Sequence, residues 1–121
     1  MLRKLRFRIE KTLDSERRAW IYHLKGKFVG SQECYEFLED ARSRIDTHTP
    51  NVVLLMSEIT FINSTAIGMI AALLTHSGSE NGAVFLVGVS DSARRQLKAT
   101  HVGDFLTMVD HLDDLPENLE K

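Results

Sequence analysis

Three adjacent small polar residues, Asn63, Ser64 and Thr65, carry the side chains we single out first for their chemistry. The amide oxygen of Asn63 and the two hydroxyl oxygens can each accept a hydrogen bond from a free backbone N–H group at the start of a helix. One of the three is therefore expected to be an N-cap. The sequence thus predicts a hydroxyl-bearing turn, and if the chain has a functional site we expect it there.

The segments on either side of this turn must position it. Residues 52–56 form a continuous apolar run, which is typical of a strand covered on both faces and so of a central strand in a sheet. After the turn, Ile67, Ile70, Ala71 and Leu74 recur at the spacing of one helix face. We therefore expect a core strand, the polar turn and a core helix, in that order.

Other chemistry finds little support in the sequence. The five histidines are spread along the chain without ligand spacing, so no metal site is expected. The Gly-x-Ser-x-Gly elbow of hydrolases is absent around Ser64, and Gly78 and Gly82 do not form a phosphate-binding loop. We therefore expect neither an enzyme nor a cofactor-binding protein.

Length and composition bound the class of protein. With 121 residues, 43% hydrophobic and 26% charged, the chain fits one soluble globular domain over residues 1–121. The formal charge of −2 gives no electrostatic reason to expect nucleic acid binding. No apolar run approaches the roughly 20 residues needed to cross a bilayer, and the basic N-terminus does not resemble a signal peptide, so we expect a cytoplasmic protein. The single cysteine, Cys34, is expected to be a packed thiol.

Two strands are expected near the N-terminus. Apolar and charged residues alternate over 5–10, which is the period of a half-exposed strand. A less regular alternation runs over 17–24, and residues 14–16 form the turn between the two, so a β-hairpin is predicted. Gly26 is expected to end the second strand.

Helices and strands are expected to alternate through the rest of the chain. The elements are, in order, a helix over 31–45 capped by Ser31, the central strand and helix described above, a strand over 83–87, a helix from Ser90 or Asp91 to about Thr100, a strand over 106–109 and a final helix from Asp113.

This order predicts the α/β class: a mixed sheet of four to five strands with about four helices packed on it. Each strand–helix–strand step should cross over right-handed, which places the Ser64 turn at the carboxyl end of a central strand. Open α/β sheets usually have their sites at that edge. Leu54, in the middle of the apolar run, is expected to be fully buried.

The segment from Phe61 to Gly68 resembles the signature of the STAS domain, best known in bacterial anti-sigma factor antagonists. Here it reads Phe-Ile-Asn-Ser-Thr-Ala-Ile-Gly, whereas the family has an aromatic and an apolar residue followed by Asp-Ser-Ser/Thr-Gly-Leu-Gly. The resemblance covers nearly the whole chain in the order of its elements. Weaker similarities lie in the corner at residues 26–29, at Gly82, over 92–97 and at a Gly103 turn.

The resemblance implies a small cytoplasmic domain that binds other proteins. Many members are switched by a partner kinase that phosphorylates the first hydroxyl after the Asp, and in this chain that hydroxyl belongs to Ser64. The partner-binding residues it implies are Gly26, Phe28, Asn63, Ser64, Thr65, Ile67 and Gly68.

Three positions depart from the family pattern. Asn63 stands in place of the Asp, Ala66 in place of the usual Gly, and Val29 in place of a common acid after the Gly26 corner. Asn keeps the ability to form turns and caps but lacks the charge, so a kinase that relies on the acid would fail here. The residues therefore leave open whether Ser64 is a phosphoacceptor or simply a cap.

Two functions follow from the resemblance. The first is a regulatory module that binds an anti-sigma factor or a serine kinase, with a phosphatase to reverse the modification of Ser64. The alternative is a non-phosphorylated scaffold or subunit of a stressosome-like or lipid-transport complex. In either case we expect a protein partner, no nucleic acid and no membrane-spanning segment, and a weak homodimer stays open.

Overall fold

A five-stranded mixed sheet in the order β1-β2-β3-β4-β5 forms the centre of the computed structural model, which describes residues 6–119. Its strands are β1 (Arg8–Asp14), β2 (Ala19–Phe28), β3 (Asn51–Ile62), β4 (Val84–Val87) and β5 (Thr107–Val109). β1 and β2 pair antiparallel, and all later neighbours pair parallel. The predicted α/β class with a mixed sheet is confirmed.

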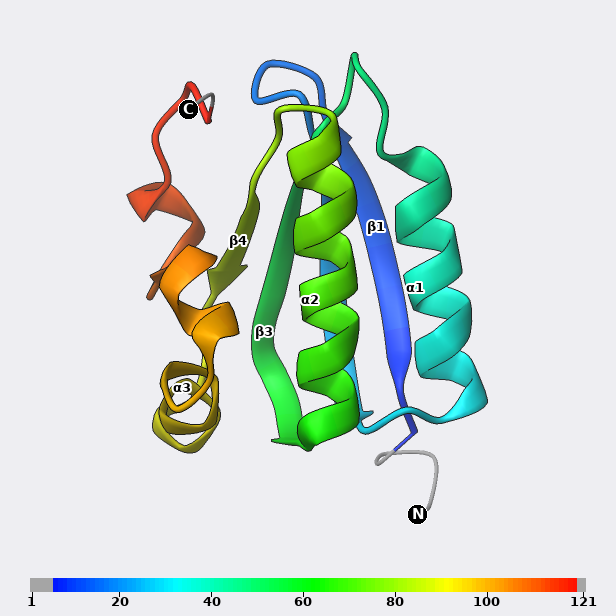
Figure 1. The fold of residues 1–121 in the computed structure, drawn as a ribbon, viewed down its shortest axis with the longest axis vertical. Helices are drawn as coiled ribbons and strands as arrows, with labels where there is room; N and C mark the ends of the chain where they lie inside the picture. The colour runs from blue at the N-terminus through cyan, green and yellow to red at the C-terminus, as the bar shows by residue number, and fades with distance from the viewer. Residues whose placement is uncertain (1–5, 120–121) are drawn as a thin grey trace.

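Three helices connect the parallel strands: α1 (Gln32–Arg44), α2 (Ser64–Ser79) and α3 (Asp91–Lys98). In Figure 1, α1 and α2 lie side by side in front of the sheet, and α3 lies near its lower end. The main core forms between these helices and the sheet, and it includes Phe37, Leu73 and Leu97 from the helices. Leu54 of β3 is 0% exposed in this core, as predicted. No helix within residues 6–119 is long and apolar enough to cross a membrane.

The helix starts follow local rules that the sequence displays. The hydroxyl of Ser31 accepts a hydrogen bond from the N–H of Cys34 at 3.3 Å, and α1 begins at Gln32, the residue after Ser31. Ser90 caps α3 in the same way, accepting from the N–H of Ala93 at 3.1 Å. Ser31 was predicted as a cap because a small hydroxyl residue preceded the helical pattern, and for α3 the prediction left Ser90 and Asp91 open.

The N-terminal hairpin differs from the prediction in extent. Its first strand was predicted over residues 5–10 but begins at Arg8 and continues to Asp14, while Leu5 lies outside the described residues. Gly26 does not end the second strand, which runs on to Phe28. Gly26 has a φ of 96° and lies where the pairing of β2 with β3 shifts register, so its positive φ lets the strand bend and continue.

The buried face of α2 is rotated relative to the prediction. The fully buried residues of this helix are Ala66, Met69, Ile70, Leu73 and Ser77. Of the predicted stripe only Ile70 belongs to this set, whereas Ile67, Ala71 and Leu74 are half-buried. The predicted period is correct, but α2 is apolar around most of its surface, so the period alone did not determine which side faces the sheet.

The C-terminal segment is not the α-helix that was predicted from Asp113. It contains the short 3₁₀ helix η3 (Leu112–Asp114), and the residues after it are irregular. Leu115 and Leu119 pack against Val53 and Phe85 on the face of the sheet opposite the helices. Pro116 lacks a backbone N–H and disfavours helix, which leaves the segment extended enough to cover this face.

A charged cluster fastens α1 to the hairpin. The carboxylate of Asp40 on α1 accepts hydrogen bonds from the Tyr22 hydroxyl at 2.6 Å, from the Lys11 amine at 3.0 Å and from the Arg44 guanidinium at 3.1 Å. Burial raises the pKa of Asp40, but these hydrogen bonds outweigh it and hold that pKa below its ordinary value. Burial, and then the bond to Asp40, raise the pKa of Tyr22 far above its ordinary range. The cluster therefore supports the fold and lies on α1 and the hairpin, not at the Ser64 turn.

Candidate functional site

Ser64 is the first residue of α2, directly after the carboxyl end of β3, as the sequence predicted. The N-cap of this helix is Asn63, whose Oδ1 accepts a hydrogen bond from the N–H of Ala66 at 3.1 Å. The Ser64 side chain is exposed, and its hydroxyl has no hydrogen-bond partner among residues 6–119. Asn63 therefore does the capping and leaves the Ser64 hydroxyl free.

Asn63 also joins the turn to the corner between β2 and α1. Its Nδ2 donates a hydrogen bond to the carbonyl oxygen of Val29 at 3.1 Å, across 34 residues of sequence. An Asp at this position, the family residue, has no N–H with which to make this bond. The amide thus holds the two segments together as one surface.

Gly30 brings this corner into close contact with the start of α2. Its φ is 95°, and a Cβ atom at this position would lie 2.6 Å from Cγ2 of Thr65. A side chain here would be strained by the backbone and would also collide with Thr65. The corner therefore lies against the start of α2, and Gly30 makes the contact.

The remaining predicted partner-binding residues divide by exposure. Thr65 and Gly68 are exposed on the first turns of α2, and Ile67 is half-buried beside them. Gly26 is buried, and Phe28 is 0% exposed, with its ring stacked on Phe7 at a centroid distance of 5.3 Å. Phe28 and Gly26 thus support the corner from inside and do not present surface to a partner.

Phe61 is a candidate that the site prediction missed, although it belongs to the segment that resembles the family signature. Its side chain is 53% exposed at the end of β3, and it borders a cavity of about 50 Å³ together with Ser90 and Gln96 of the α3 region. Side chains alternate along a strand, and Ile62 is buried. The contrast between the neighbours Phe61 and Ile62 is the local signal for an exposed Phe61, and it is incomplete because Thr60 is exposed as well.

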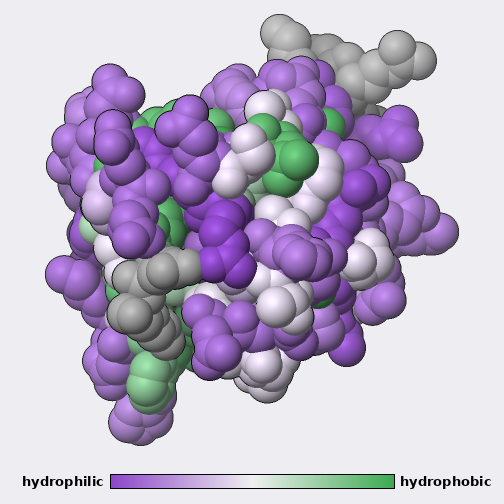
Figure 2. All heavy atoms as spheres, turned by 90° about the horizontal axis from the view of Figure 1, so that it is seen from above, coloured by the Kyte–Doolittle hydropathy of each residue, from purple (hydrophilic) through white to green (hydrophobic). Residues whose placement is uncertain are grey.

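The opposite end of the molecule has a different character. Viewed from above, it is covered mainly by hydrophilic residues (Figure 2). Its loops are held by polar side chains: Asp46 accepts hydrogen bonds from the N–H groups of His48 and Thr49, at 2.9 and 2.8 Å. These two backbone donors, that of Thr49 first, lower the pKa of Asp46. The polar groups there close the loops, so we place the candidate site at the Ser64 end.

Solved structures share this fold at low sequence identity. A STAS domain protein of Planctomyces limnophilus has a TM-score of 0.72 and 13% identity, with 88% of this chain and 92% of that chain covered. An anti-sigma factor antagonist of Mycobacterium paratuberculosis has a TM-score of 0.70 and 18% identity, covering 88% and 90%. The Bacillus anti-sigma factor antagonist SpoIIAA, in its unphosphorylated form, has a TM-score of 0.62 and 16% identity, covering 90% and 92%. Its phosphorylated form has a TM-score of 0.57 at 16% identity, covering 85% and 90%.

Sequence comparisons agree with the fold. No curated protein sequence matches this chain. The family profile of the STAS domain matches residues 9–115. This range includes all three helices, the Ser64 turn and all five strands, apart from the first residue of β1. The chain therefore belongs to the STAS domain family.

Proposed function

We propose that this protein is a cytoplasmic regulatory module that binds a protein partner and is switched by phosphorylation of Ser64. Its docking surface consists of the exposed residues Ser64, Thr65 and Gly68, the corner at 29–30 and the Phe61 side chain. The partner is an anti-sigma factor or a serine kinase, and a phosphatase reverses the modification.

The free hydroxyl of Ser64 is the observation that carries this proposal. A serine that caps a helix has its oxygen occupied by a backbone N–H, and modification would cost the helix its cap. Here the cap is Asn63 at 3.1 Å from the N–H of Ala66, so Ser64 can be modified without that loss. The existence of SpoIIAA structures in both an unphosphorylated and a phosphorylated form supports the same role for this chain.

Electrostatics favour tolerance of a phosphoryl group by the fold. The group would bring about −1.5 to −2 charges to the first turn of α2, where free N–H groups and the positive end of the helix dipole favour anions. Residues 64–67 contain no acid, and Asn63 is neutral, so no carboxylate next to the phosphate repels it. Asn63, in place of the family Asp, thus lacks a charge that a kinase could have recognised. For the same reason it does not repel the phosphoryl group once Ser64 is phosphorylated.

The partner interface would respond differently. A surface shaped for a neutral hydroxyl must desolvate the new charge when the partner binds, and buried charge without a partner group is costly. A penalty of about 3 kcal/mol weakens binding on the order of a hundredfold. Phosphorylation should therefore release the partner and leave the domain folded.

The test compares wild type, Ser64→Ala and Ser64→Asp as baits in a pull-down from native cells, followed by identification of the proteins retained. Ser79→Asp is the matched control, because it adds the same charge at an exposed position at the other end of α2. We expect wild type, Ser64→Ala and Ser79→Asp to retain the same partner and Ser64→Asp to lose it, with all four chains folded.

Phosphopeptide mapping of the chain isolated from those cells completes the test. Phosphate on Ser64 is the expected result. If Ser64→Asp binds as wild type does and Ser64 carries no phosphate, the switch is absent. Transporter or scaffold proteins among the retained partners would then favour the non-phosphorylated scaffold.

A further inference from the structure

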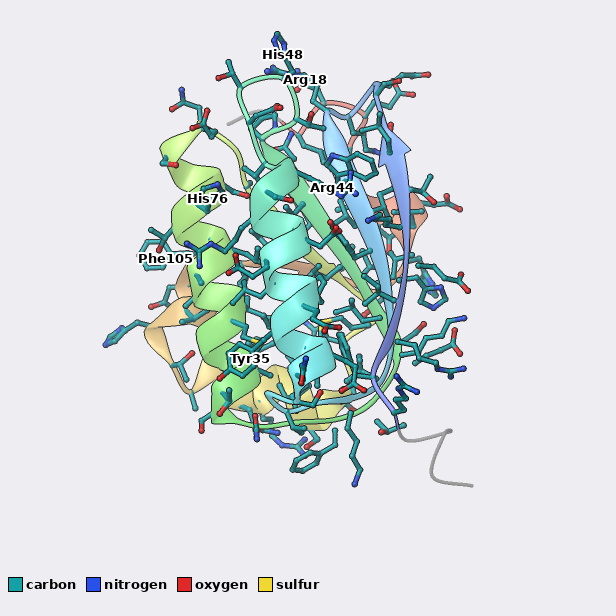
Figure 3. The ribbon with its side chains drawn as sticks, turned by 90° about the vertical axis from the view of Figure 1, so that its right-hand side faces the viewer. Arg18, Tyr35, Arg44, His48, His76 and Phe105 are labelled. Carbon is teal, nitrogen blue, oxygen red and sulfur yellow. The ribbon has the colours of Figure 1, made fainter. Side chains whose placement is uncertain are left out.

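β1 is an outer strand of the sheet, and the described residues provide no strand on its outer side. Five of its seven residues are exposed, and Leu13 is 50% exposed although it is a large apolar residue. Figure 3 looks at the molecule from this side and shows α1 beside β1, not across its edge. Within residues 6–119, the outward N–H and C=O groups of this edge therefore have no strand partner.

A groove of about 320 Å³ runs between β1 and α1. Ile9 and Phe37 give it an apolar floor, and Lys11, Glu36 and Asp40 are among the polar residues that line it. The exposed edge of β1 and this groove are adjacent, so whatever pairs with the strand also reaches the groove.

We propose that β1 pairs antiparallel with β1 of a second copy of this chain, which joins the two sheets into one. Two copies that pair in this way are related by a two-fold axis perpendicular to the sheet. Residues directly opposite each other across the two strands must have their side chains on the same face of the sheet. Because side chains alternate along a strand, a residue of one copy can be opposite only a residue of the other copy whose number differs from its own by an even number. The register centred on Lys11 satisfies this rule and uses all seven residues of β1: it pairs Arg8 with Asp14, Ile9 with Leu13, and Glu10 with Thr12.

Charge distinguishes this register from its two neighbours. Centring on Lys11 places Arg8 opposite Asp14 twice in the dimer. Arg8 has no ion pair with another described residue, whereas Asp14 is already paired with Arg17 of its own chain at 2.9 Å and would be shared between the two cations. Centring on Glu10 places this acid opposite itself, and centring on Thr12 places Glu10 opposite Asp14. Lys11 faces its own copy in the proposed register, but each amine lies 3.0 Å from the Asp40 carboxylate of its own chain, which offsets the repulsion.

The apolar residues select the same register. Leu13 pairs with Trp20 and Ile9 with Leu24, so both point to the side of the sheet that carries the helices. In the proposed dimer, Leu13 of one copy is directly opposite Ile9 of the other, and Ile9 lines the groove. Leu13 of each copy thus enters the groove of its partner and is removed from water.

Cysteine cross-linking tests the register. Only the residue on the two-fold axis faces itself, at a Cα separation of about 4.5–5.5 Å, which a disulfide can span. We expect Lys11→Cys to form disulfide-linked dimers under mild oxidation about tenfold faster than Glu10→Cys, Thr12→Cys or a Tyr35→Cys control on α1. Cys34 stays in every variant because it is buried. Equal rates in all four variants would overturn the proposal, and fastest linkage through Glu10→Cys or Thr12→Cys would overturn the register.

Sedimentation equilibrium tests the association without cross-linking. Arg8→Glu turns two attractive pairs into repulsions and should weaken dimerisation about tenfold. Leu13→Ser should also weaken it about tenfold or more, whereas Phe105→Ser, which removes a 75% exposed aromatic ring far from β1 in sequence, should leave it unchanged. Far-UV circular dichroism verifies that each variant is folded. A wild-type chain that stays monomeric at millimolar concentration, or an equal effect of Leu13→Ser and Phe105→Ser, would refute the dimer.

Discussion

Replacing Asn63 with the family residue, Asp, tests how the Ser64 turn is held. The carboxylate can still accept the hydrogen bond from the N–H of Ala66, so the helix keeps its cap. The Nδ2 group that donates to the Val29 carbonyl at 3.1 Å is replaced by a second oxygen. Two oxygens then face each other where donor and acceptor met, and the corner is no longer tied to α2.

The expected magnitude is a balance of opposing contributions. A typical hydrogen bond contributes about 0.5–1.5 kcal/mol, and because the bond to Val29 is only part-buried, leaving this acceptor unpaired costs less than the roughly 1–3 kcal/mol of a fully buried group. The new charge at the helix start recovers about 0.3–1 kcal/mol. Asn63→Asp should therefore lower the free energy of unfolding by about 1 kcal/mol at neutral pH, although Asp and Asn are equally good caps. Asn63→Ala loses the cap as well and should lower it by about 2 kcal/mol.

The pH dependence of Asn63→Asp follows from the same geometry. A carboxylate held against a carbonyl oxygen is destabilised, so its pKa in the folded state is raised above the unfolded value. The protonated form can donate to Val29, and its stabilising contribution is present at low pH and lost as pH rises through the folded pKa. The deficit relative to wild type should therefore shrink as pH falls from about 7 to about 4. If capping dominated instead, the pKa would be lowered and the deficit would grow.

Urea unfolding followed by the fluorescence of Trp20, the single tryptophan, is the assay. Ser90→Ala is the matched control, because Ser90 caps α3 at 3.1 Å and, among residues 6–119, its side chain makes no bond comparable to the one between Asn63 and Val29. It should cost about 1 kcal/mol at every pH. If Asn63→Asp is as stable as wild type at neutral pH, the bond to Val29 contributes nothing and the reasoning is refuted.

Three further substitutions test the core and the charged cluster by chemical denaturation. Leu54→Ala should lower the free energy of unfolding by about 2–5 kcal/mol, since this side chain is 0% exposed; a loss below about 1 kcal/mol would contradict the core assignment. Ser77→Ala should raise the free energy of unfolding by about 1 kcal/mol, because the Ser77 hydroxyl is buried without a partner among residues 6–119 and alanine favours helix. A loss of stability would show that the hydroxyl has a hydrogen-bond partner. Asp40→Asn should destabilise at neutral pH. Because the pKa of Asp40 is lowered in the folded state, its contribution is lost as pH falls below the ordinary value of 3.8, and a difference from wild type that persists in acid would refute the ionic role.

Much of the candidate site could be read from the sequence because its signals are local. The position of Ser64 between a buried strand and a helix followed from residues 52–74, and the caps Ser31 and Ser90 lie within three residues of the N–H groups they bind. Phe28, which the resemblance implied as a partner-binding residue, is buried. Its neighbours in space, Phe7 and Phe37, are not local, and the sequence did not show that their rings would enclose it.

The sequence by itself determined the order of the strands and α-helices up to β5, the α/β class and the turn that carries the hydroxyl, since these depend on patterns within one strand or one helix. Tertiary structure decided which side of α2 is buried, because a helix that is apolar around most of its surface has no single preferred face until it packs. It also decided that Asn63 and not Ser64 is the cap. All three candidates at 63–65 have an oxygen that can accept from the helix, but Asn63 alone also has an N–H to donate, and it lies within reach of the Val29 carbonyl.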